Sequence, residues 1–96
     1  MFKSAVKYEW DENKRLSNIE KHGLDFIDSI DVLEAPHILL KSSHREEMRF
    51  LAVGRLDEHF VTIIYTLRNL NIRIISFRRA RHEEKRKYCE LYSSRA

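Results

Sequence analysis

The spacing of apolar residues changes from a helical to a strand pattern at His37, and this change limits the folds open to the chain. Beyond it, alternating apolar and polar residues predict four strands, at His37–Lys41, Met48–Arg55, His59–Arg68 and Ile72–Phe77. The links between them are short and polar, as in antiparallel neighbours joined by hairpins. The second half of the chain is therefore predicted to form an antiparallel sheet, in which Gly54 marks a bulge or a close approach by a ligand.

A short strand and two helices are predicted to precede the sheet. The strand spans Val6–Trp10, and Asp11 after it is a good N-cap for a helix that Gly23 ends. A second helix is predicted over Leu24–Glu34. A charged helix over Arg78–Tyr92 closes the chain. The expected order is β-α-α-β-β-β-β-α, an α+β fold.

Length and composition fit one domain, residues 1–96. A chain of 96 residues buries about 60–65% of the surface that its unfolded form exposes. No apolar run approaches the roughly 18 residues of a membrane span, and the N-terminus has no export signal, so we expect a cytoplasmic protein without a membrane partner. The single cysteine, Cys89, cannot form an internal disulfide, which agrees with a reducing compartment.

Charge is divided unequally between the two halves of the chain. Residues 1–40 hold five Lys and Arg against eight Asp and Glu, a net charge of −3, whereas residues 41–96 hold thirteen against seven, a net charge of +6. Seven of these cations lie within Ile72–Tyr88. A basic surface of this kind is typical of proteins that bind a polyanion such as RNA, and a plain solvated face is the alternative.

Alternation within the strands predicts which arginines share a face. Residues expected on one side of the last strand are Ile72, Ile74, Ser76 and Arg78, with Arg73, Ile75 and Phe77 on the other. Arginine can grip phosphate oxygens with two N–H groups and stays charged at any accessible pH. For each arginine, an ion pair with one of the chain's 15 carboxylates is the alternative.

A series of short segments, spread over nearly the whole chain, occurs in a recognisable order. The segments are Tyr8–Lys14, Lys21–Gly23, Phe26, Arg49–Phe50, Val53–Arg55, Tyr65–Arg68, Ile72–Ala80, Glu83 and Tyr88. Together they resemble the BrnT toxin family. The resemblance implies a RelE-like fold, with two helices packed on an antiparallel sheet, and a ribonuclease that halts translation. Ser29 and Phe77 stand where the family pattern usually has alanine, and these changes concern packing more than chemistry.

The same resemblance implies partners. It predicts a cognate antitoxin, BrnA, whose ribbon-helix-helix part binds operator DNA and whose complex with the toxin represses their own operon. RNA is the predicted substrate. The competing function class is a non-catalytic basic module that grips nucleic acid through phosphate contacts alone.

Cleavage of RNA by protein side chains alone is the expected chemistry. The ribose 2′-hydroxyl attacks the neighbouring phosphorus, and the protein moves two protons and stabilises negative charge on the phosphoryl oxygens. The chain has no HxH or HExxH motif, and a solvated helix face accounts better for the row of Asp25, Asp28 and Asp31, because carboxylates on a helix surface diverge. We therefore expect neither a metal nor another cofactor.

Catalytic roles are assigned on this resemblance and on the expected clustering. Arg78, with Arg55 and Arg68 beside it on the sheet, is expected to hold the scissile phosphate. His22 is expected to carry a proton, and the alternative is a helix-end residue that contacts terminal carbonyls. Lys14 lies about two helical turns before it on much the same face and is expected to bind the RNA backbone.

Further side chains are predicted to assist. Glu83 orients an arginine or takes a proton, unless it pairs with Arg79 or Lys87, each four residues away. Tyr65 and Tyr88 stack on bases, unless they pack in the core. The other predicted substrate-binding residues are Ser76, Arg73 and Arg79.

Overall fold

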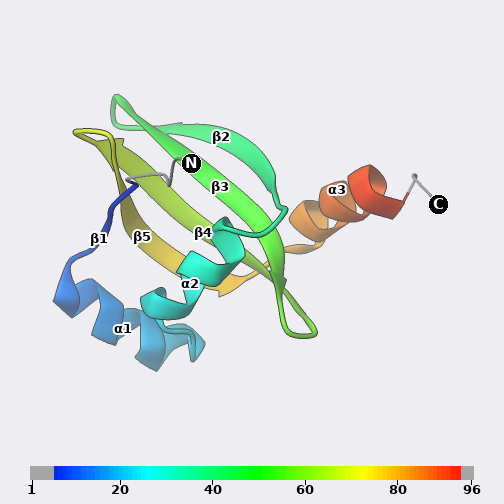
Figure 1. Ribbon diagram of the computed structural model, residues 1–96, viewed down its shortest axis with the longest axis horizontal. Coiled ribbons are helices and arrows are strands. Elements are labelled where there is room, and N and C mark those ends of the chain that lie inside the picture. The colour runs from blue at the N-terminus through cyan, green and yellow to red at the C-terminus, as the bar shows by residue number, and fades with distance from the viewer. Residues whose placement is uncertain (1–5, 94–96) are drawn as a thin grey trace, which may run out of the picture.

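The computed structural model describes residues 6–93 and arranges them as a five-stranded sheet with three helices (Figure 1). The elements are β1 (Tyr8–Glu9), α1 (Glu12–His22), α2 (Phe26–Leu33), β2 (Ile38–His44), β3 (Glu47–Leu56), β4 (His59–Arg68), β5 (Asn71–Arg79) and α3 (His82–Ser93). The predicted order is confirmed. In the sheet the strands lie in the order β1-β5-β4-β3-β2. No helix within residues 6–93 is long and apolar enough to cross a membrane.

The four consecutive strands β2 to β5 form the predicted antiparallel sheet. The first strand adds a parallel pair, since Tyr8 and Glu9 lie opposite Ile72 and Arg73 of β5. β1 is shorter than the predicted Val6–Trp10, because among the described residues only these two pair with the sheet. Beyond Arg73, the edge of β5 therefore faces α1 rather than another strand.

Local signals set the ends of the first helix. The Asp11 side chain accepts hydrogen bonds from the backbone N–H groups of Asn13 (2.8 Å) and Lys14 (3.4 Å), as an N-cap does. Gly23 follows the helix with a φ of +71°, and its N–H donates to the Ile19 carbonyl at 2.8 Å. Both predicted caps are confirmed.

α1 and α2 cover one face of the sheet, and the core lies between them and the strands (Figure 1). α2 begins at Phe26, two residues later than predicted, because Asp25 is its N-cap. Phe26 is fully buried together with Ala52, Ile63 and Phe77 of three neighbouring strands. Burying each large apolar side chain contributes about 1.5–3 kcal/mol, which makes this layer the main source of stability.

Gly54 lies in β3 where α2 approaches closely. A Cβ atom at this position would be 2.8 Å from Cγ1 of Val32 and 3.3 Å from Cβ of His37. The close neighbour is the chain's own helix α2, whereas the prediction was a ligand. The bulge, which was the other prediction for Gly54, lies in β5 instead.

This bulge changes which side chains of β5 share a face. Ser76 lies opposite Ile64, but the next residue of β4 lies opposite Ile74, so that Ile75 is extra. The alternation is shifted by one residue there, and Arg73 shares a face with Ser76. The predicted faces of β5 are therefore wrong for the residues before the bulge.

α3 begins at His82 and not at the predicted Arg78. Arg78 and Arg79 belong to β5, where they lie opposite Thr62 and Val61 of β4. The two arginines are thus fixed to opposite faces of β5, rather than carried on a solvated helix.

Candidate active site

The sheet face that α1 and α2 leave uncovered carries five of the eleven predicted site residues, and we call it the outer face. Its members follow from the strand pairing, because residues directly opposite each other lie on the same face. They include Arg55, Phe60, Thr62, Ile64, Thr66, Arg73, Ser76 and Arg78. α3 lies at one end of this face, where Thr62 donates a hydrogen bond to Glu84 (Figure 1).

Three predicted residues meet in one hollow at the edge of the outer face. We call it the α1–β5 hollow, and its cavity volume is about 240 Å³. The described residues that line it are Lys14, Ser17, Asn18, Lys21 and His22 of α1 and Ile75 and Ser76 of β5. Lys14, His22 and Ser76 are predicted site residues. Lys21 is not, although it follows Lys14 by seven residues, and two turns of helix bring it to the same face.

Asn18 fastens α1 to the free edge of β5. Its Nδ2 donates to the carbonyl oxygens of Phe77 (2.8 Å) and Leu24 (2.9 Å), and its Oδ1 accepts from the Phe77 N–H at 3.1 Å. The side chain thus satisfies the backbone groups that a neighbouring strand would otherwise pair. Asn18 is 7% exposed. Sequence reasoning missed it, because a polar residue within a polar helix stretch carries no local signal of burial.

A buried ion pair lies beside Ser76 on the outer face. The Arg78 guanidinium donates to both carboxylate oxygens of Glu84, at 2.9 Å each, and the two side chains are 12% and 9% exposed. The Thr62 hydroxyl and the Arg81 backbone N–H also donate to Glu84, each at 2.8 Å. Burial alone would raise the pKa of Glu84, but these hydrogen bonds lower it to about 2. The arginine is therefore held rigidly.

The carboxylate that orients Arg78 is Glu84 and not the predicted Glu83. Glu83 is exposed and binds Arg86 at 2.6 Å, which lowers the pKa of Glu83. Its expected partners, Arg79 and Lys87, do not form that ion pair. Glu84 is the third residue of α3 and reaches back to the N–H before the helix, as in a capping box. The predicted helix begins four residues too early, at Arg78, so Glu84 was not recognised as the third residue of the helix.

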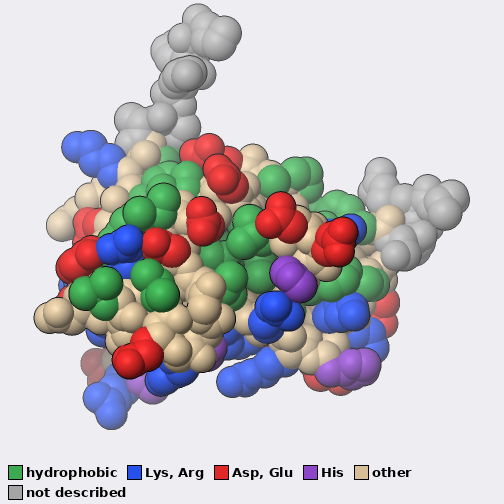
Figure 2. Space-filling model, turned by 90° about the horizontal axis from the view of Figure 1, so that it is seen from below, with side chains coloured by type: hydrophobic (Ala, Val, Ile, Leu, Met, Phe, Trp, Pro, Cys, Tyr) green, Lys and Arg blue, Asp and Glu red, His purple; other side chains and the backbone are tan. Residues whose placement is uncertain are grey.

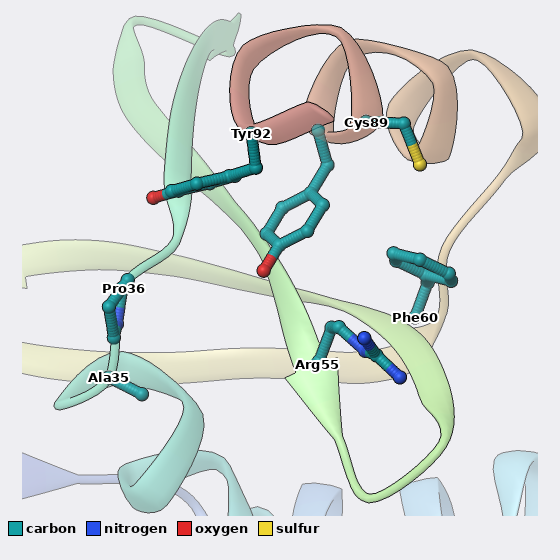
Figure 3. Close-up of a pocket in the computed structure, with 7 residues that line it drawn as sticks. Ala35, Pro36, Arg55, Phe60, Cys89 and Tyr92 are labelled. Atoms are coloured by element: carbon teal, nitrogen blue, oxygen red, sulfur yellow. The ribbon is translucent and has the colours of Figure 1, made fainter. Parts of the chain in front are cut away.

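A second hollow, the α3 hollow, lies where α3 meets β3 and β4. Its cavity volume is about 500 Å³, and it is lined by Ala35, Pro36, Arg55, Phe60, Tyr88, Cys89 and Tyr92. Arg55 Cζ lies 5.2 Å from the ring centroid of Phe60. Figure 3 shows Arg55 and Tyr92 on different sides of this hollow. Arg55 is therefore separated from His22, which lines the other hollow.

Comparison with known proteins identifies the family. Residues 10–84 match the family described as the ribonuclease toxin BrnT of type II toxin-antitoxin systems. The chain belongs to the BrnT family. Its structure is similar to the crystal structure of the Brucella abortus ribonuclease toxin BrnT, with a TM-score of 0.65 and 29% sequence identity, over 81% of this chain and 100% of that one. Among curated proteins, none matches the chain.

Membership of the BrnT family implies a cognate antitoxin. The segment that matches the family also covers the two hollows to different extents. The matched segment contains all the residues of the α1–β5 hollow and both members of the Arg78–Glu84 pair. It ends before Tyr88, Cys89 and Tyr92 of the α3 hollow. The match thus covers the whole lining of the α1–β5 hollow and four of the seven lining residues of the α3 hollow.

The predicted arginines do not form one cluster in this BrnT-family chain. Arg78 lies opposite Thr62, and Arg68 is six residues further along β4, about 20 Å away at the rise of a strand. Arg68 instead lies 4.0 Å from Glu47. The expectation that Arg55 and Arg68 stand beside Arg78 is thus wrong for Arg68, whereas Arg55 lies nearer, opposite Phe60.

Arg73, Arg79 and Tyr65 have other surroundings. Arg73 donates to Glu9 at 2.9 Å, and this hydrogen bond is the main cause that lowers the pKa of Glu9. Arg79 is exposed on the opposite side of β5 from Arg73. Tyr65 is 8% exposed, burial raises its pKa, and its ring stacks on Phe50 with centroids 5.3 Å apart. Its burial favours core packing over the predicted contact with a base.

The aspartates of α2 do not converge on a point. Asp25 caps the helix and accepts a hydrogen bond from Arg15 Nε at 2.8 Å, which lowers the pKa of Asp25. Asp28 and Asp31 are exposed. Among residues 6–93, no group of three or more His, Cys, Asp and Glu side chains is placed to hold a metal ion.

Acidic and basic side chains are separated on the molecular surface. Figure 2 shows the Asp and Glu side chains mostly in the upper half of the face in view, and the Lys and Arg side chains mostly along its lower half. Charges of opposite sign are thus separated on this face of the molecule. A polyanion is attracted to the basic side.

Proposed function

We propose that the chain cleaves RNA without a metal ion, by attack of a ribose 2′-hydroxyl on the adjacent phosphorus. The observation that carries this proposal is the meeting of Lys14, His22 and Ser76 in the α1–β5 hollow, beside the paired Arg78. The reaction leaves a 2′,3′-cyclic phosphate and a 5′-hydroxyl group. It needs a proton carrier, hydrogen-bond donors and positive charge at one phosphate, and these four side chains supply all three.

His22 takes the proton of the attacking 2′-hydroxyl in this proposal, and the ammonium group of Lys14 or Lys21 gives a proton to the leaving 5′-oxygen. It is the last residue of α1 and is exposed, so a substrate in the hollow can reach its imidazole. Lys14 and Lys21 bring two ammonium groups to the same hollow, where they offset the charge of the phosphate. The Ser76 hydroxyl donates a hydrogen bond to a phosphoryl oxygen.

Arg78 stabilises the phosphate from a fixed position. The hydrogen bonds that it makes with Glu84 and with the Arg79 carbonyl, within the described residues, use three of its five N–H groups, which leaves two for a phosphate oxygen. Ser76 is two residues away on the same face, about 7 Å along the strand. A guanidinium held in place before the reaction costs no reorganisation when charge develops.

The biological setting of the proposal follows from its chemistry and its family. Cleavage of messenger RNA in the cytoplasm would inhibit translation. The cognate antitoxin, which we propose to be BrnA-like with a ribbon-helix-helix part, would neutralise the toxin and bring the complex to operator DNA. The type II toxin-antitoxin family of the chain supports an antitoxin partner.

A cleavage assay with matched histidine variants tests the proposal. Purified wild type, His22→Ala and His44→Ala are incubated with a short single-stranded RNA in EDTA; His44 is an exposed histidine of β2 and serves as the control. We expect wild type and His44→Ala to cleave, and His22→Ala to be slower by about 10²-fold or more. Loss of wild-type cleavage in EDTA would contradict the metal-free route. Tight binding by wild type with no cleavage under any condition would favour the non-catalytic binding module.

A further inference from the structure

The α3 hollow has the size of a site for an organic ligand. Its cavity volume of about 500 Å³ lies within the range of about 300–1,000 Å³ that is usual for such sites. Figure 3 shows Arg55, Phe60, Cys89 and Tyr92 around an open space, with Ala35 and Pro36 along one side. The proposed cleavage chemistry uses none of these residues.

Aromatic rings from two elements form one wall of the α3 hollow. The Phe60 and Tyr88 rings have centroids 5.5 Å apart at an interplanar angle of 72°, and Tyr88 and Tyr92 follow at 4.6 Å and 41°. Tyr88 and Tyr92 are four residues apart and so lie on the same face of α3. Tyr92 is 37% exposed. Three rings inclined to one another thus form an apolar wall, on which Tyr92 is accessible.

Cations adjoin this wall. The Arg55 Cζ and the Lys85 Nζ lie 5.2 Å and 5.0 Å from the Phe60 centroid. Arg55 is exposed, and within residues 6–93 its guanidinium lies in no ion pair with a carboxylate. None of the seven described residues that line the hollow is acidic. Flat rings beside free cations match a ligand that joins an aromatic ring to a negative charge, as a nucleotide does.

We infer that the α3 hollow holds one unpaired base of the RNA, stacked between the Tyr92 ring and the Arg55 guanidinium, with Lys85 at the flanking phosphate. The inference rests on the proposed function, because it takes RNA to cross the outer face. The base subsite lies near Phe60. Ser76 lies opposite Ile64, which is four residues from Phe60 along β4, so the subsite and Ser76 are about 13 Å apart. A single strand covers that distance in a few nucleotides.

The substrate must therefore be single-stranded at this place. A base within a duplex is paired and stacked on its neighbours, whereas bases in loops and ends can turn out onto aromatic rings and arginine planes. A peptide of the antitoxin is the other occupant that an apolar groove admits. The cations and the lack of acidic lining residues favour the nucleic acid.

An abasic scan tests the inference. The probe is a single-stranded oligonucleotide with 2′-O-methyl riboses, which the enzyme cannot cleave, and each base is removed in turn. We expect one position at which loss of the base weakens binding to wild type about tenfold, measured by fluorescence anisotropy at fixed salt. Arg55→Gln and Tyr92→Leu, both at exposed positions, should abolish this dependence on the base. Tyr8→Leu, on the opposite side of the sheet, should keep it.

Two results of the scan overturn the inference. One is an equal effect of base removal at every position. The other is an Arg55→Gln variant that binds intact and abasic probes more weakly by the same factor, since this would mean a phosphate contact alone. Because the probe cannot be cleaved, base dependence without any nuclease activity would refute the proposed function and leave the subsite standing. Cleavage without base dependence would refute the subsite alone.

Cys89 provides a second measurement on the unmodified protein. It is the chain's single cysteine and lines the α3 hollow, so its reaction with a thiol reagent reports on the hollow alone. We expect the single-stranded probe to slow this reaction and a duplex of the same sequence to leave it unchanged. A free protein whose Cys89 does not react, or protection by the antitoxin but not by the single strand, would overturn the inference.

Discussion

Replacing Glu84 by Gln removes the charge that holds Arg78 and keeps the size of the side chain. The pKa of Glu84, about 2 against an ordinary 4.5, corresponds to about 3 kcal/mol of stabilisation of the folded protein. Breaking a buried ion pair by removing one partner costs roughly 3–5 kcal/mol, because the other charge stays buried and unpaired. We therefore expect Glu84→Gln to lower the free energy of unfolding at pH 7 by about 3 kcal/mol, or the melting temperature by roughly 12–24 °C.

The pH dependence of this loss has a definite sign. The pKa of Glu84 in the folded protein lies below its ordinary value, so the stabilisation is fully present above pH 4.5 and is lost as the pH falls toward 2. The difference between wild type and Glu84→Gln should therefore shrink from about 3 kcal/mol at pH 7 to below about 1 kcal/mol at pH 2. Urea unfolding at a series of pH values measures it.

The neighbouring carboxylate gives the control. Glu83 is exposed and pairs with Arg86 on the surface of α3, so Glu83→Gln should change the free energy of unfolding much less. If the two variants lose the same stability, or if the loss in Glu84→Gln does not depend on pH, the buried pair does not have the role given to it. Cleavage should also slow in Glu84→Gln, because Arg78 loses its fixed position.

Two further substitutions test how the site is built. Asn18→Ala removes the side chain that pairs with the Phe77 backbone, so it should lower the free energy of unfolding by roughly 2–3 kcal/mol and slow RNA cleavage. A change below about 0.5 kcal/mol in urea unfolding would contradict this expectation. Gly54→Ala places a Cβ atom 2.8 Å from Cγ1 of the buried, β-branched Val32 and should destabilise the protein by roughly 1–3 kcal/mol. At a strand position with free space, replacing Gly by Ala stabilises a protein. A Gly54→Ala variant that is more stable than wild type would therefore show that α2 does not pack tightly on β3.

The parts of the fold that the sequence predicts are those set by neighbouring residues. Asp11 and Gly23 define the ends of α1 through their own backbone and side-chain geometry, which is why both caps were predictable. The bulge at Ile75 was not, because no glycine or other local signal accompanies it and it is visible only in the pairing with β4. It alters which side chains share a face with Ser76, and thus the composition of the outer face.

The site was predictable in part for the same reason. Lys14 and His22 lie on one helix, so their shared face follows from helical spacing. The partner of Arg78 depends on where α3 begins, and a start placed four residues too early directed attention to Glu83 instead of Glu84. The family resemblance, which rests on the order of many short segments, proved more reliable than any single residue role.

The chemical ends of the cleaved RNA test the central claim most directly. Wild-type protein is incubated with a defined single-stranded RNA in EDTA, and the product masses distinguish the possible termini. Side chains of the α1–β5 hollow that act on the ribose 2′-hydroxyl must leave a 2′,3′-cyclic phosphate and a 5′-hydroxyl group. A 5′-phosphate, or cleavage that depends on an added divalent metal, would contradict the account.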